Sequence, residues 1–340
     1  MCCFSYLRRK IASMNILFLL GNGFDKNLGF PTSYAEFYDY YLSDKLNQNL
    51  YDENVAKLKK EIGENKVDWA DLELQMGRYL TQVESEQAAD SLHRSIKFSL
   101  IEYLNSVLKD FSCNDTQRKK FVADLISPEK YLLVEDRNTV SEYKNKDTYK
   151  KVDVISFNYD DIFETIVGLG STSVKLNDYY TLTGTIHVHG TLKEGLIIGL
   201  DNEEQFHNSS LLQSSLLRNK YIKSNYCKIA RDGRDRKCRS LINSANIIYM
   251  YGLSIGETDK RWWKYIAERL KASDAKLIIF WFDKDSRFTS QDLVEQFEEE
   301  QRIKKMFLSH SGFGEDIVQM LQDQIYVKIF TSQENGFLKI

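Results

Sequence analysis

Five short runs of consecutive apolar residues stand out along the chain, separated by long stretches of mixed polarity. Continuous apolar runs of this length are typical of strands that are buried on both faces of a parallel sheet. They therefore predict the strands of one sheet. The runs are residues 15–20 (NILFLL), 152–157 (VDVISF), 246–251 (NIIYMY), 276–282 (KLIIFWF) and 325–330 (IYVKIF).

Between these runs the apolar residues recur every three or four positions, which is the helical period. Residues 257–270 and 292–307 have this pattern, and Ser33 with Glu36 forms the S-x-x-E sequence of a helix-capping box. Strands that alternate with helices require crossover connections, so the pattern predicts an α/β fold with an open, doubly wound, mostly parallel, Rossmann-like sheet. Sheets of this kind bind ligands at the carboxyl ends of their strands.

A long helical block interrupts this alternation after the first predicted strand. From residue 33 to residue 130 the pattern is helical, including 69–83 and 88–111, and no run in it fits the sheet. We therefore predict a helical insertion subdomain at 33–130. The remaining residues, 1–32 and 131–340, are predicted to form an α/β nucleotide-binding core.

Three further segments carry weaker signals. Residues 136–151 are polar and basic and predict an exposed loop, while 211–242 predicts a second helical stretch. Within that stretch, 228–239 holds six basic and two acidic residues and is interpreted as a solvated helix face or loop, with a partner or nucleic-acid contact as the alternative. Met14 stands directly before the first strand, and residues 1–13 fit no predicted element, so Met14 is an alternative start of translation.

The composition narrows the classes of partner. The chain has 340 residues, of which 46 are basic and 49 acidic, giving a formal net charge of −3. A balance near zero supplies no overall field that would attract nucleic acid or an anionic membrane. No stretch of about 18 apolar residues occurs, and the five cysteines contain no C-x-x-C pair. We therefore expect a soluble, cytoplasmic protein with reduced thiols, no metal and a small-molecule ligand.

The first candidate site directly follows the first predicted strand. In residues 20–25 (LGNGFD), Gly21 and Gly23 flank Asn22, and glycines there would let backbone N–H groups approach an anionic ligand. A G-x-G pair alone is also what a tight strand turn requires. Asp25 is suited to a ribose hydroxyl, or it caps the N-terminus of the next helix.

The second candidate site follows the predicted strand at 152–157. Asn158 offers both amide donors and an acceptor at the strand's carboxyl end, and Asp160 and Asp161 follow it. A helix cap is the alternative role for Asn158. Two polar strand exits in one sheet are expected to meet at one crevice.

Two further polar segments complete the candidate site. In residues 185–191 (TIHVHGT), strand alternation predicts that His187 and His189 share a face, and His189 is interpreted as a general base rather than a metal ligand. Residues 251–259 (YGLSIGETD) bring Gly252 and Ser254 to another strand exit, where they would hold part of a nucleotide. In the alternative interpretation, Gly252 simply ends the strand, and Thr258 or Asp259 caps the following helix.

The order of these motifs resembles that of the AbiH-type bacteriophage abortive-infection family. The segments LFLLGNGFD, LGFPTSYAEF, WADLE, ISFNYDD, HVHGT and YGLSIGETD span most of the chain. That family in turn resembles the sirtuin-like NAD-hydrolysing domains of antiphage systems, which share a Gly-rich loop, an N-x-D segment, a His-Gly dipeptide and a late Gly/Ser loop. The chain lacks the paired C-x-x-C zinc module of deacetylase sirtuins, so the resemblance does not extend to protein deacetylation.

The resemblance implies a sirtuin-like core and an antiphage protein that hydrolyses NAD⁺ between nicotinamide and ribose. It implies that Asn158 orients the ribose or the water, that His189 accepts a proton, and that Asp25 or Asp160 supports the developing positive charge. The residues implied to bind the dinucleotide are Gly21, Asn22, Gly23, Asp25, Gly252 and Ser254.

Other functions and partners stay open at this point. One alternative is a non-catalytic sensor that binds NAD⁺ or ADP-ribose in the same crevice. Another is a Mg²⁺-dependent nuclease that uses Asp160, Asp161 and Glu164. The helical insertion could hold the enzyme inactive until a phage-derived activator binds, and the chain could form a homo-oligomer.

Overall fold

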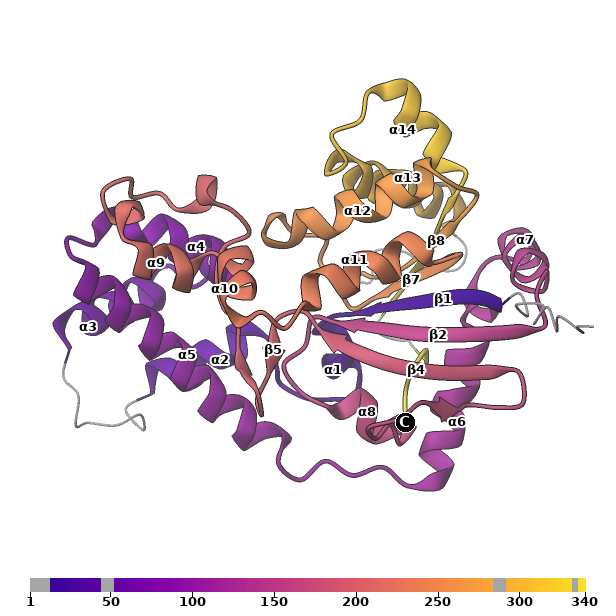
Figure 1. Cartoon of the computed structure of the whole chain (residues 1–340), viewed down its shortest axis with the longest axis horizontal. Helices are drawn as coiled ribbons and strands as arrows, with labels where there is room; N and C mark the ends of the chain where they lie inside the picture. The colour runs from indigo at the N-terminus through magenta and orange to yellow at the C-terminus, as the bar shows by residue number, and fades with distance from the viewer. Residues whose placement is uncertain (1–12, 44–51, 284–291, 332–335) are drawn as a thin grey trace, which may run out of the picture.

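A seven-stranded sheet runs through the computed structural model, which describes residues 13–43, 52–283, 292–331 and 336–340. The strand order is β3-β4-β2-β1-β7-β8-β9 (Figure 1). The strands are β1 Ser13–Leu20, β2 Tyr149–Ser156, β3 Val174–Lys175, β4 Tyr180–His187, β7 Ile247–Tyr251, β8 Lys276–Phe282 and β9 Ile325–Phe330.

All neighbouring strands are parallel except the short edge strand β3, which is antiparallel to β4. Without β3, the order has the 3-2-1-4-5-6 pattern of the dinucleotide-binding fold, with β1 in the centre. The predicted α/β fold with a mostly parallel, Rossmann-like sheet is therefore confirmed, and each of the five apolar runs forms one of its strands.

Helices cover both faces of the sheet because the strands are apolar on both sides (Figure 1). Along β1, Phe18 and Leu20 face one hydrophobic cluster, and Leu17 and Leu19 face another. The first cluster includes residues of α1 Gly23–Asn27, α6 Asp115–Ile126, α7 Val134–Lys144 and α8 Ile162–Val167. The second includes residues of α11 Arg234–Ser244, α12 Lys260–Lys271, α13 Leu293–Ser309 and α14 Glu315–Gln322.

The remaining helices form a lobe beside the carboxyl ends of the central strands (Figure 1). A third hydrophobic cluster fills this helical lobe, and Ser33 with Glu36 forms the predicted capping box at its first helix. The helices are α2 Tyr34–Leu42, α3 Glu53–Glu64, α4 Leu72–Tyr79, α5 Glu86–Leu108, α9 Ser215–Tyr221 and α10 Lys223–Ala230. The third cluster thus combines the insertion with residues 196–222, whereas α6 packs on the sheet through Phe121 and Leu125.

Short elements join these parts. The 3₁₀ helices are η1 Asp68–Ala70, η2 Leu80–Gln82, η3 Pro128–Tyr131, η4 Glu203–Gln205, η5 Leu211–Gln213 and η6 Glu257–Asp259. A small hairpin of β5 Gly190–Thr191 and β6 Gly195–Leu196 lies between β4 and the helical lobe. Residues 1–12 lie outside the described part of the chain, so the hypothesis about Met14 stays a hypothesis.

The prediction of an exposed loop at 136–151 is wrong. Helix α7 occupies Val134–Lys144, and β2 already begins at Tyr149. The helix buries Val140 completely and Tyr143 almost completely against the sheet, while most of its other residues are polar. Because so few apolar positions mark its inner face, helical periodicity could not reveal it, and tertiary packing stabilises it instead.

Candidate active site

The loops after β1 and β7 touch each other at the centre of the sheet. The N–H group of Gly21 donates to the carbonyl of Tyr251 at 3.0 Å, and that of Gly23 donates to the carbonyl of Gly252 at 2.9 Å. A Cβ atom on Gly23 would lie 2.6 Å from the Cα of Gly252, so glycine is required for this approach. The two loops therefore form a close backbone contact at the position where this fold type binds dinucleotides.

This contact bears on the prediction that the N–H groups of Gly21 and Gly23 bind an anionic ligand. The glycine N–H groups expected to face an anionic ligand are already paired with carbonyl oxygens. Asn22 accepts a hydrogen bond from the hydroxyl of Thr32, and Ser254 is exposed on the far loop. In this structure the glycines serve loop packing, and dinucleotide binding by these residues stays a prediction.

Asn158 joins the loop after β2 to the loop after β1. Its side chain is buried and donates to the carboxylate of Asp25 at 2.9 Å and to the carbonyl of Gly21 at 3.3 Å. Asp25 lies inside α1 and Asn158 lies four residues before α8, so the alternative roles of these two residues as helix caps are wrong. The prediction that the loops after β1 and β2 meet is therefore confirmed for Gly21, Asp25 and Asn158.

Asp25 and Asp160 form a buried carboxyl pair beside Asn158. Burial and the neighbouring Asp160 carboxylate raise the pKa of Asp25 well above its usual range, and burial also raises the pKa of Asp160. The interaction between the two carboxyl groups favours the protonated form of Asp25 and the ionised form of Asp160. Asp160 also accepts the N–H of Ile162 at 3.0 Å, so Asp160 and not Asn158 caps the turn into α8. Of the two carboxyl groups, Asp25 is therefore the one that keeps its proton more readily.

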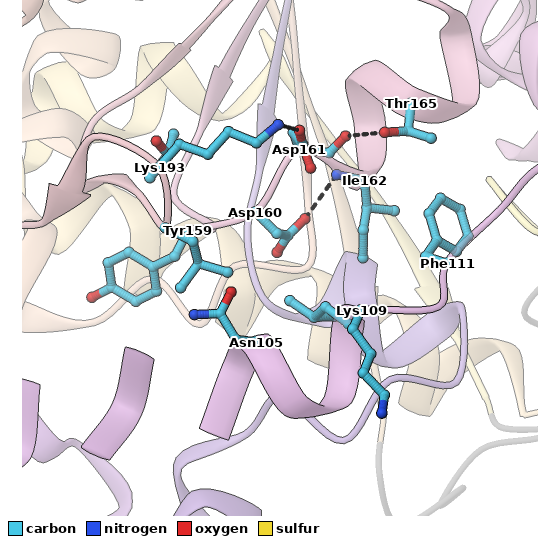
Figure 2. A pocket seen from close by; sticks show the side chains of 12 residues that line it. Asn105, Lys109, Phe111, Tyr159, Asp160, Asp161, Ile162, Thr165 and Lys193 are labelled. Atoms are coloured by element: carbon cyan, nitrogen blue, oxygen red, sulfur yellow. Dashed lines mark hydrogen bonds and ion pairs between the residues drawn. The ribbon is translucent and has the colours of Figure 1, made fainter. Parts of the chain in front are cut away.

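Asp160 lines a cavity of about 340 Å³ between α8, the end of α5 and the β5–β6 hairpin. Figure 2 shows Asp160 between Tyr159 and Ile162, with Asn105 of α5 opposite. Two lysines, Lys109 and Lys193, also line the cavity. Among the catalytic residues that the sequence predicted, Asp160 lines it, whereas Asn158 and His189 do not.

His187 bridges the Asn158 carbonyl and the Glu164 carboxylate. Its Nδ1 lies 2.9 Å from the carbonyl of Asn158, and its Nε2 lies 2.7 Å from Glu164. Both partners are acceptors, so both ring nitrogens donate and the imidazole is satisfied when it is protonated. Burial lowers the pKa of His187, but the hydrogen bond and charge of Glu164 outweigh this and leave it raised.

His189 belongs to a different group of partners, so the prediction that the two histidines share a strand face does not hold. Strand β4 ends at His187, and the alternation stops before His189. The ring of His189 lies against Phe157 and Tyr159, with centroids 5.6 and 6.2 Å apart. Its Nε2 lies 3.1 Å from Asp259 and 3.3 Å from Lys223.

Lys223 and Glu73 complete this buried network, and neither was predicted as a site residue. Lys223 Nζ lies 2.6 Å from Glu73 Oε2 and 3.3 Å from Asp259 Oδ1, and Lys223 is only 1% exposed. Asp259 occupies the N-cap position of α12, but its side chain makes no capping hydrogen bond there. Glu73 lies in the WADLE segment, which the family resemblance could have pointed to, but the sequence around Lys223 carries no comparable signal.

Burial and the neighbouring charges shift the pKa values of His189, Asp259 and Glu73 in this network. Burial and the Lys223 ammonium lower the pKa of His189, so its imidazole is neutral at pH 7. Burial would raise the pKa of Asp259, but Lys223 and His189 hold it well below its usual range. Burial raises the pKa of Glu73 to about 7 despite the nearby Lys223. The network thus presents a neutral imidazole beside an ionised carboxylate.

The acidic residues proposed for the nuclease alternative have separate partners. Asp161 pairs with Lys193 at 2.5 Å, Glu164 pairs with His187, and Asp160 pairs with Asp25. Across the described ranges, no group of three or more His, Cys, Asp and Glu side chains is arranged to hold a metal ion. In the same part of the chain, no helix has both the length and the apolar character needed to cross a membrane.

The fold and the site define a doubly wound α/β protein with the strand order of dinucleotide-binding folds and buried titratable groups at the carboxyl ends of its central strands. Over residues 17–281, the sequence matches the family described as Bacteriophage abortive infection AbiH, and the chain belongs to that family. The protein therefore takes part in abortive infection, a defence against bacteriophage. A comparison with curated proteins found no match.

Proposed function

We propose that this abortive-infection protein hydrolyses the bond between nicotinamide and ribose in NAD⁺, and that Asp160 is the residue that faces the reacting ribose. The observation that supports this proposal is the carboxyl pair Asp25–Asp160, whose outer member lines the cavity. A negative charge held in a poorly solvated position is suited to stabilising positive charge that develops in a transition state.

The chemistry of NAD⁺ matches such a site. When the bond between C1′ and the nicotinamide nitrogen breaks, the bonding electrons neutralise the pyridinium ring, and the leaving group departs without a proton. Positive charge then develops on the ribose, where the Asp160 carboxylate would stabilise it. Water adds to C1′ and loses one proton, which gives nicotinamide and ADP-ribose.

His189 is the proton acceptor in this proposal. Its imidazole is neutral at pH 7 because burial and Lys223 lower its pKa, and Asp259 would stabilise the imidazolium after proton uptake. The ring lies behind Tyr159, whose own side chain lines the cavity. Asn158 acts in this proposal as a positioning residue, since its amide holds Asp25 against Asp160.

The size of the cavity limits which part of NAD⁺ it would hold. At about 340 Å³ it lies near the lower end of ligand pockets, so it suits one ring and a ribose rather than a whole dinucleotide. The pyrophosphate would then lie at the rim, where Lys109 and Lys193 supply positive charge. Lys193 is paired with Asp161 in this structure and would exchange that partner for a phosphate.

A non-catalytic sensor of the same nucleotides is the second candidate, because the side chains of Asn158 and His189 lie outside the cavity. To distinguish the two, purified protein is incubated with NAD⁺, and nicotinamide and ADP-ribose are quantified by chromatography. Release of both products in equal amounts supports the hydrolase. Calorimetric binding of NAD⁺ without products supports the sensor, and cleavage of DNA or RNA in a parallel incubation with Mg²⁺ supports the nuclease.

A further inference from the structure

A second cavity lies in the helical lobe and shares no lining residue with the first. Its volume is about 260 Å³, and it is bordered by α5, the end of β6 and the residues after it, and helices α9 and α10. The residues that line it are His93, Arg94, Lys97, Phe98, Leu196, Ile197, Ile198, Lys220 and Tyr226. Nothing in the proposed hydrolysis uses this cavity.

The floor of the cavity is apolar. Leu196, Ile197 and Ile198 line it, and each is at most 3% exposed. Phe98 on α5 is 60% exposed, which is unusual for a phenylalanine next to a hollow. His93 is buried in the wall and faces the carbonyl of Ile198, and burial lowers its pKa to about 4, so it adds no charge at neutral pH. These surfaces favour a flat apolar group.

The charged residues that line the cavity give it an excess of positive charge. Three cations line the cavity, and the single carboxylate of Asp90 pairs with two of them, Arg94 and Lys220. Within the described residues, no carboxylate pairs with Lys97, whose ammonium lies 5.6 Å from the ring centre of Tyr226. Burial and the nearby Lys220 ammonium lower the pKa of Lys97, so an anion placed between the two lysines would relieve their repulsion.

We propose that this cavity binds a small aromatic anion, a single ring that carries a phosphate or carboxylate group. The ring would pack on Ile197 and Phe98, and the anionic group would lie between Lys97 and Lys220. Volume supports a ligand of this size, since 260 Å³ is just below the usual range for drug-sized molecules. Apolar contact and charge-assisted hydrogen bonds would then contribute together.

The wall of this cavity is bonded to the buried network of the candidate active site. The N–H of Ile197 donates to the carbonyl of His189 at 2.7 Å, and the N–H of Gly199 donates to Glu73 at 2.9 Å. Lys220 also lies on α9, directly before the helix that begins with Lys223. A ligand in the cavity would therefore contact residues 196–198, and this segment is hydrogen-bonded to His189 and, through Gly199, to Glu73.

Isothermal titration calorimetry with phenyl phosphate tests the proposal, with inorganic phosphate and phenol titrated separately. The wild-type protein should bind one phenyl phosphate, and each part alone should bind at least about tenfold more weakly. Lys97→Met should weaken phenyl phosphate binding by about tenfold, because it removes the cation without breaking an ion pair that the structure shows. Lys119→Met, an exposed lysine of α6, is the matched control and should bind like wild type.

Three results would overturn the proposal. The wild-type protein does not bind phenyl phosphate, it binds inorganic phosphate as tightly as phenyl phosphate, or Lys97→Met binds phenyl phosphate as tightly as wild type. Since Lys97 is half-buried, circular dichroism verifies that the variant is folded. If Lys97→Met fails to fold, Phe98→Ala replaces it, because this largely exposed ring should be removable and its loss should weaken phenyl phosphate without changing inorganic phosphate binding.

Discussion

Lys223 Nζ lies 2.6 Å from Glu73 Oε2, and both side chains are almost completely buried. The two residues come from α10 and α4, which are far apart in the sequence and adjacent in the helical lobe. Lys223 also contacts Asp259 at the start of α12, so one ammonium connects the helical lobe with the α/β core. Removing it would leave two carboxyl groups without their cation.

The first prediction follows from this arrangement. Lys223→Met should lower the free energy of unfolding by about 3–5 kcal/mol, because loss of one partner leaves buried charge uncompensated. Urea denaturation followed by tryptophan fluorescence measures the change. Lys57→Met is the control, since Lys57 forms an exposed pair with Glu53 and its loss should leave the free energy of unfolding nearly unchanged. Equal effects of both substitutions would contradict a structural role for the buried network.

A second prediction concerns the contact between the two glycine loops. Gly23→Ala should destabilise the protein by about 1–3 kcal/mol, because its Cβ would lie 2.6 Å from the Cα of Gly252. Gly170→Ala is the matched control, since a Cβ at that exposed glycine meets no atom within 4 Å. Thermal unfolding of the two variants measures the difference. If Gly23→Ala is as stable as Gly170→Ala, the loops do not pack as described.

A third prediction concerns the pH dependence of stability. The pKa of Asp25 is raised in the folded state, so the folded protein keeps a proton that the unfolded chain loses above its usual pKa of 3.8. The contribution of Asp25 to stability is therefore full at acidic pH and is lost as pH rises through the folded pKa. In Asp25→Asn, the free energy of unfolding should fall less between pH 4 and pH 7 (about the range where such carboxyls titrate) than in wild type.

Urea denaturation at several pH values measures this slope. Asp178→Asn, an exposed aspartate between β3 and β4, is the control and should keep the wild-type slope. The asparagine at position 25 can still accept from Asn158, which preserves the hydrogen bond between these two side chains. A wild-type slope in Asp25→Asn would show that Asp25 is ionised in the folded protein.

A fourth prediction tests the role of Asp160 in the proposed hydrolysis. Asp160→Asn should lower NAD⁺ turnover by about 10²–10³-fold, since it removes the negative charge that stabilises the ribose cation. Asp161→Asn is the control because Asp161 lines the same cavity but is paired with Lys193, and its turnover should fall by less than about tenfold. Nicotinamide release under saturating NAD⁺ measures both. Equal losses would assign no special role to Asp160.

The fifth prediction treats His189 as the proton acceptor. His189→Ala should lower turnover by about 10²–10⁴-fold, whereas the exposed His207→Ala should not change it. Adding Asn158→Ala should cost much less than the product of the single losses, because the residues act in one step. Both side chains are buried, so circular dichroism must show folded variants before rates are compared. Wild-type turnover in folded His189→Ala would exclude this histidine from the mechanism.

Much of the sheet was predictable because strands buried on both faces must be apolar throughout. The runs at 15–20 and 276–282 needed no information beyond this pattern. Helix α7 was not predictable by the same means, since only Val140 and Tyr143 mark its buried side clearly. The helix depends on the sheet that covers those two residues, and periodicity cannot report such a contact.

For the candidate site, too, one part was predictable from the sequence and another part was not. Placing Gly21, Asp25 and Asn158 together required only the rule that carboxyl ends of parallel strands meet at one edge. That rule says nothing about which groups remain open to a ligand. Backbone pairing between Gly23 and Gly252, and the burial of Asn158 behind Asp160, were decided by the packing of loops against each other.

By itself, the sequence determined the parallel sheet and the clustering of polar strand exits, because each depends on local period and strand direction. Only the tertiary structure decided that Asp25 and Asp160 interact as buried carboxyl groups and that Lys223 joins Glu73, Asp259 and His189. Protonation and ion pairing depend on burial and on distances of a few ångströms between residues remote in the chain. No local pattern encodes those distances.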